Sequence, residues 1–162
     1  MADVLVVAVF DDERKAWDAV VTASTIAAQG QLGLHDACLV VRADDGKVHK
    51  RETHDISTKK GGWYGGAWGL LGGAIIGFPL AVAAAGAGIG AFMARRRDLG
   101  ITDEFERAVA DRLEPGKSAA VVLVDESHAT GIETAAQNRG AWTRTVTLAD
   151  ADADAEATAP SQ

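Results

Sequence analysis

A long run without a single charged side chain, from Gly61 to Ala94, constrains this chain more than any other feature. Glycines recur at every fourth position on both sides of Pro79, which would place them along one face of a helix. In water, each glycine in a helix costs up to about 1 kcal/mol relative to alanine. The run is therefore expected either in lipid or buried against protein. The glycines of this stripe are Gly61, Gly65, Gly69, Gly73, Gly77, Gly86 and Gly90.

The length of the uncharged run favours two helices over one. A single helix of this length would extend roughly 51 Å at about 1.5 Å per residue, whereas a bilayer has a hydrocarbon core of about 30 Å. Pro79 would also break such a helix near its middle. The sequence therefore predicts a glycine-zipper helical hairpin over residues 61–97, inserted into the rest of the chain.

Basic residues at both ends of the run favour a hairpin whose two ends lie on the cytoplasmic side of a membrane. Tryptophan and tyrosine near the start suit the interface between lipid and water. We therefore expect the protein at the cytoplasmic face of the inner (plasma) membrane, with lipids as partners. The predicted membrane-interface residues are Lys59, Lys60, Trp63, Tyr64, Arg95, Arg96 and Arg97.

The same glycines have a second interpretation that involves no lipid. In a soluble, cytoplasmic homo-oligomer they would pack between subunits, as a particle or scaffold. The near-neutral mean hydropathy of +0.02 supports this alternative. Both interpretations predict that the protein associates with itself.

The flanking segments predict strands and helices in alternation. Continuous apolar runs at 4–10 and 119–124 are typical of strands covered on both faces. Asp45-Gly46 lies between two extended segments and predicts a hairpin turn, whose second strand is polar and suits a sheet edge. Helices are expected from about Asp12, from Thr102 and from Ser127, the first two with acidic first turns.

The order of these elements predicts an α+β fold. It corresponds to a ferredoxin-like βαββαβ sandwich with an extra C-terminal αβ unit and the inserted hairpin. Residues 1–60 and 98–149 would form one discontinuous domain, 61–97 the hairpin and 150–162 a disordered acidic tail without large apolar side chains.

Composition excludes several functions. A net charge of −7, with 16 basic against 23 acidic residues, leaves no extended cationic face for nucleic acid. A single cysteine, Cys38, allows neither an intrachain disulfide nor a cysteine-ligated zinc site, and it is expected to be buried. The histidines are expected at the surface, and the acidic cluster at Asp11 is expected to cap a helix. No catalytic residue, metal or cofactor is predicted.

Several local motifs together resemble one family. They are Asp11-Asp12-Glu13, the hairpin from Val40 to Val48, the glycine-rich run, the segment from Gly100 to Phe105 and the segment from Leu113 to Ala119. Over most of its length, to about Leu148, the chain is similar to bacterial domain-of-unknown-function family 1269, whose members are commonly described as predicted membrane proteins. The resemblance implies membrane association but no activity or substrate.

These observations predict a non-enzymatic, membrane-associated, self-assembling protein with an envelope or stress role. The soluble oligomer is the first alternative. A small-ligand-sensing domain that uses an open face of the sheet is the second.

Overall fold

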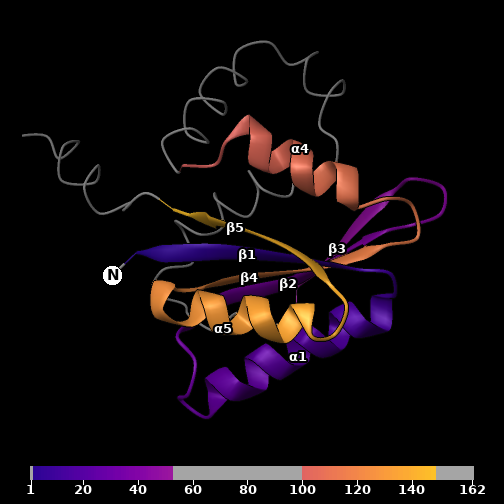
Figure 1. The fold of residues 1–162 in the computed structure, drawn as a ribbon. Coiled ribbons are helices and arrows are strands. Elements are labelled where there is room, and N and C mark those ends of the chain that lie inside the picture. Colours follow the sequence, from indigo (N-terminus) through magenta and orange to yellow (C-terminus); the bar gives the residue numbers. More distant parts are fainter. Residues whose placement is uncertain (1, 53–99, 149–162) are drawn as a thin grey trace, which may run out of the picture.

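Five antiparallel strands form the centre of the fold, in the order β3-β2-β4-β1-β5 (Figure 1). The structure, a computed structural model, describes residues 2–52 and 100–148. The predicted hairpin at 61–97, with all its glycine and membrane-interface residues, and the predicted tail at 150–162 lie outside the described residues. The strands are β1 (Asp3–Phe10), β2 (Leu34–Arg42), β3 (Val48–Glu52), β4 (Ser118–Asp125) and β5 (Trp142–Thr147).

The two apolar runs occupy inner positions of the sheet, as predicted. β1 and β4 pair along their whole length, from Asp3 opposite Asp125 to Phe10 opposite Ser118. Both faces of these strands are buried, which explains why their sequences show no polar alternation. The polar strand β3 lies at one edge, also as predicted. Gly46 turns the chain into β3 with a φ of +82°.

Three helices cover the sheet in the described part of the chain, and two of them begin at the predicted caps. They are α1 (Glu13–Ala28), α4 (Asp103–Arg112) and α5 (Glu126–Gln137). The Asp12 carboxylate accepts a hydrogen bond from the Arg14 N–H at 2.6 Å, and the Thr102 hydroxyl accepts one from the Phe105 N–H at 3.1 Å. Each cap satisfies a backbone donor at the start of a helix that has no partner inside the helix.

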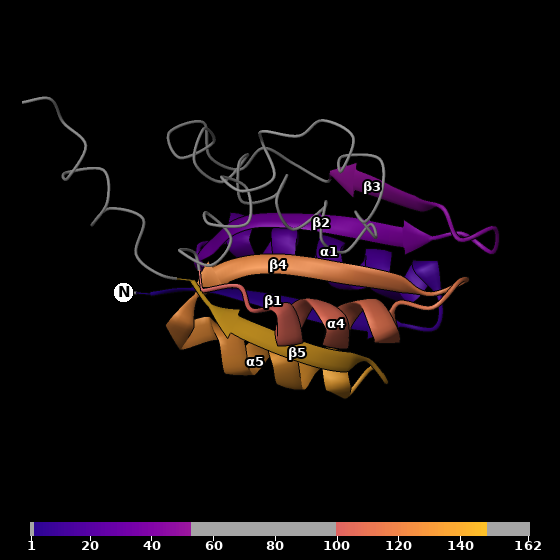
Figure 2. The ribbon, with the colours of Figure 1, turned by 90° about the horizontal axis from the view of Figure 1, so that it is seen from above.

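The helices lie in two layers on opposite sides of the sheet (Figure 2). α1 and α5 cover one face, where they bury Val4, Val6 and alternate residues of the neighbouring strands. α4 covers the other face and packs on a core that includes Leu5 and Val7. The α+β class predicted from the sequence is confirmed.

The two helices that share a face of the sheet are not the pair expected from the order of elements. In a sandwich built from the first six elements, the helix that starts after Thr102 would lie beside α1. In the structure α5 shares a face with α1, and α4 lies on the opposite face. The apolar stripe of Phe105, Val109 and Leu113 is buried as predicted. Such a stripe identifies the buried side of a helix and not the sheet face that it covers.

Candidate functional site

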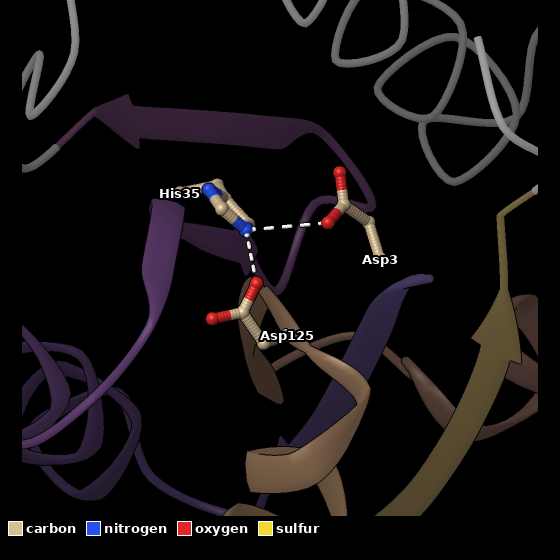
Figure 3. A group of neighbouring side chains, drawn as sticks. All are labelled: Asp3, His35 and Asp125. Carbon is tan, nitrogen blue, oxygen red and sulfur yellow. Dashed lines mark hydrogen bonds and ion pairs between the residues drawn. The ribbon is translucent and has the colours of Figure 1, made fainter. Parts of the chain in front are cut away.

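Three side chains from three strands meet at one end of the sheet (Figure 3). Because β1 and β2 both run antiparallel to β4, their first residues lie beside the last residues of β4. Asp3 is directly opposite Asp125 in this register, and His35 is the second residue of β2. We call Asp3, His35 and Asp125 the strand-end cluster.

The imidazole of His35 lies between the two carboxylates. Its Nε2 atom is 2.9 Å from Asp125 Oδ1 and 3.2 Å from Asp3 Oδ1. The side chains of His35, Asp125 and Asp3 are 21%, 29% and 22% exposed, so the cluster is partly accessible to solvent. One nitrogen and two carboxylate oxygens, all within 4.8 Å of one another, form a set of atoms of the kind that binds metal ions.

A backbone irregularity positions His35. The pairing between β2 and β4 shifts register between Leu34 and Asp36, so β2 contains a bulge at His35. Leu34 and Ala37 therefore both face the core under α1 and α5, although their separation along the chain is an odd number of residues. Bulges commonly redirect a side chain next to functional sites, and this one accompanies the approach of His35 to Asp125.

Gly33 gives the Asp125 carboxylate its space. A Cβ atom at position 33 would collide with that carboxylate, lying 2.6 Å from Asp125 Cγ. The Gly33 carbonyl also accepts a hydrogen bond from the Asp125 N–H at 2.9 Å. The cluster in this arrangement therefore requires glycine at position 33.

A cavity of about 300 Å³ lies next to the cluster, between α1, α5 and the sheet. Its walls are mainly small apolar side chains, including Ala19 and Ala23 from α1 and Ala8 from β1. Polar groups come from Thr22 on α1 and from the two ends of α5, with Ser127 and His128 at its start and Arg139 just beyond its end. The Gly33 N–H lies 3.4 Å from His128 Nδ1, so Gly33 contacts both the cavity wall and the cluster.

Two histidines do not occupy the surface positions predicted from the sequence. His49 is exposed, but His35 is partly buried between carboxylates and His128 is partly buried in the cavity wall. Local spacing contained no signal for the strand-end cluster, because His35 and Asp125 are 90 positions apart and only the strand register joins them. Cys38 is buried as predicted, and Asp12 caps α1 as predicted.

The structure describes residues 2–52 and 100–148. In these residues no helix is both long enough and apolar enough to cross a bilayer. Helices pack on both faces of the sheet in these same stretches.

The fold and the cluster define an α+β protein with a helix-covered antiparallel sheet and a site built at its strand ends. The family model described as a protein of unknown function (DUF1269) matches residues 63–156, and the chain belongs to this family. The resemblance seen in the sequence is thereby confirmed. No curated protein and no solved structure matches the chain significantly. Asp125 and His128 lie inside the matched region, and Asp3 and His35 precede it.

Proposed function

We propose that this protein is a non-enzymatic, membrane-associated protein that assembles with itself through its glycine-rich segment. The observation that carries the proposal is the uncharged run from Gly61 to Ala94 with its four-residue glycine repeat. In lipid, apolar burial does not drive helices together, so close backbone packing along small residues is a main source of helix association.

The arrangement of the described elements supports an inserted hairpin. β3 ends at Glu52 and pairs with β2, whereas α4 begins at Asp103 and packs on the core that includes Leu5 and Val7. The chain therefore leaves one α+β unit and returns to the same unit. A membrane hairpin needs both of its ends on one side. The basic residues Lys59, Lys60 and Arg95–Arg97 would place that side in the cytoplasm, near anionic headgroups.

We further propose that six elements, β1, α1, β2, β4, α5 and β5, form a ferredoxin-like sandwich. The strand order β2-β4-β1-β5 and the shared face of α1 and α5 support this assignment. β3, the glycine-rich segment and α4 would then form one insertion between β2 and β4.

Fractionation of the full chain without detergent tests membrane association. We expect the protein in the membrane pellet, resistant to a carbonate wash and released by detergent. A soluble, uniform particle of high mass would instead support the homo-oligomer in which the glycine-rich helices pack between subunits.

A matched pair of variants tests the role of the glycine repeat in assembly. The double variant Gly69→Leu and Gly73→Leu places bulky side chains on the repeat, and we expect it to lower the mass of the oligomer. Ala67→Leu with Ala74→Leu adds the same side chains off the repeat and should leave the mass unchanged. Equal masses for both variants, with native circular dichroism, would contradict assembly through the repeat.

The cavity between α1 and α5 favours a second candidate function, binding of a small ligand. Its volume of about 300 Å³ is at the lower end of the range for small-molecule sites, and such sites combine apolar walls with a few polar groups. Anilinonaphthalene sulfonate, which combines apolar aromatic rings with one sulfonate group, is a suitable probe. We expect saturable binding that Ala135→Trp, in the cavity wall, abolishes and that Ala28→Trp, at the exposed end of α1, leaves intact.

A further inference from the structure

We propose that the strand-end cluster of Asp3, His35 and Asp125 binds a divalent transition-metal ion. This inference is independent of the proposed membrane association, since it rests on described residues of the α+β unit. It adds a metal site to a chain whose sequence contains no local metal-binding motif.

The donor set selects the class of ion. One imidazole nitrogen and two carboxylate oxygens suit first-row divalent ions such as Zn²⁺, Mn²⁺, Fe²⁺ and Co²⁺. Copper(I) prefers sulfur ligands, and Ca²⁺ prefers six to eight oxygens. Because the three side chains are partly exposed, water molecules would supply the remaining ligands.

The distances require little rearrangement. Ligand atoms at about 2.1 Å from an ion lie about 3.0 Å apart at adjacent octahedral positions and about 3.4 Å apart at tetrahedral positions. The separations of His35 Nε2 from Asp125 Oδ1 and Asp3 Oδ1, 2.9 Å and 3.2 Å, are close to these values, and all three ligand atoms lie within 4.8 Å of one another. In the metal-bound state, Nε2 would exchange its hydrogen for the ion, and the neutral imidazole would carry its proton on Nδ1.

The surrounding backbone holds these donors in place without a metal. The register of β1 against β4 sets Asp3 beside Asp125, the bulge in β2 brings in His35, and the absent side chain of Gly33 leaves space for the Asp125 carboxylate. A divalent ion would add positive charge between two partly buried carboxylates that face the same imidazole. It would also join the starts of β1 and β2 to the end of β4, where α5 begins.

Cobalt binding to the full-length protein, freed of purification tags and treated with a chelator, tests the site. We expect one Co²⁺ per chain with a visible d–d absorption band, and displacement of Co²⁺ by Zn²⁺. His35→Gln should lower the affinity by at least about tenfold, because it removes a ligand and not merely a supporting contact. His49→Gln, which changes an exposed histidine on β3, is the matched control and should bind as the parent protein does.

Asp3→Asn provides an independent variant should His35→Gln fail to fold. Asp3 is the first residue of β1 and its side chain is partly exposed, so the amide is expected to preserve the fold while weakening cobalt binding. Absence of saturable binding, or equal affinity in the parent, His35→Gln and Asp3→Asn proteins, would overturn the proposal. Displacement of Co²⁺ by an equal concentration of Ca²⁺ would overturn the assignment to a transition metal.

Discussion

The two faces of the sheet are buried by different means. On one face, among the described residues, α4 and its C-cap residue insert the large side chains of Phe105, Val109 and Leu113, each at most 3% exposed. On the other face α1 and α5 contribute mainly alanines to the buried positions, such as Ala16 and Ala136, and a cavity remains between the two helices. Large side chains from one helix fill the space over a sheet, whereas small side chains on two helices leave space at their junction.

The cavity lies on the less filled side of the sheet, and Gly33 connects it to the strand-end cluster. His128 lines the cavity under α1 and α5 and lies at hydrogen-bonding distance from the N–H of Gly33, which in turn makes room for Asp125. The tightly packed side under α4 is thus expected to determine stability, and the less filled side to hold the ligand site. Substitutions that distinguish the two sides test this division.

Truncation of Phe105 should produce the largest loss of stability. Phe105→Ala removes a side chain that is 3% exposed at the centre of the α4 face, and it should lower the free energy of unfolding by about 3–5 kcal/mol. The control is Trp17→Ala, on the outer side of α1, where the side chain is 40% exposed. Because part of this side chain is exposed already, its removal should lower the free energy of unfolding by only about 1 kcal/mol. Urea denaturation followed by circular dichroism measures both, and similar losses would show that α4 does not determine stability.

A matched pair of alanine-to-valine substitutions compares the packing of the two faces directly. Ala119 belongs to the core under α4 and is fully buried, so Ala119→Val should destabilise by about 1–3 kcal/mol through overpacking. Ala8, on the neighbouring strand, lines the cavity. Ala8→Val can extend into that space, gaining up to about 0.8 kcal/mol per buried methylene-sized group. Chemical denaturation should therefore give effects of opposite sign, and equal destabilisation would mean that the cavity wall is as closely packed as the α4 core.

Two glycine-to-alanine substitutions examine the link between the cavity and the strand-end cluster. Gly33→Ala would force the Asp125 carboxylate away and should cost about 1–3 kcal/mol. Gly131 lies inside α5 with open space around an added Cβ, so Gly131→Ala should stabilise by about 0.5–1 kcal/mol. Thermal unfolding of both proteins checks the signs. An unchanged melting temperature for Gly33→Ala would show that Asp125 has another position of equal energy.

Much of the fold could be predicted from local sequence, because its causes are local. The continuous apolar runs marked β1 and β4, Asp45-Gly46 marked the hairpin, and Asp12 and Thr102 marked helix starts. Which face of the sheet each helix covers depends on how the chain crosses from one strand to the next. The local sequence pattern does not indicate this. For that reason α4 and α5 did not take the partners expected from the order of elements.

The strand-end cluster lay beyond sequence reasoning for a related cause. Asp3, His35 and Asp125 meet only through the register of three strands and a bulge in one of them, and a shift by one residue would send a side chain to the other face. The neighbours of His35 in the sequence, Gly33 among them, give no signal that identifies a metal site. The glycine-rich segment differs in this respect. Its four-residue repeat is evident in the sequence alone, and the role of the repeat is a proposal.

Removal of the cap of α4 should have the smallest effect on the comparison of the two faces. Thr102→Ala deletes the hydroxyl that accepts a hydrogen bond from the Phe105 N–H, and it should cost about 1 kcal/mol. The control is Thr134→Ala on α5, where the exposed hydroxyl donates a hydrogen bond to the Thr130 carbonyl of its own helix. Alanine favours the helix there, so stability in urea should be equal or slightly higher.

Amide exchange shows whether this cap also supports the packing of the α4 face. Because the capped N–H belongs to Phe105, loss of the cap should loosen the residue that fills this face. Exchange at Phe105 should therefore accelerate in Thr102→Ala and not in Thr134→Ala. Unchanged exchange at Phe105 would mean that packing on the sheet, and not the cap, holds the first turn of α4.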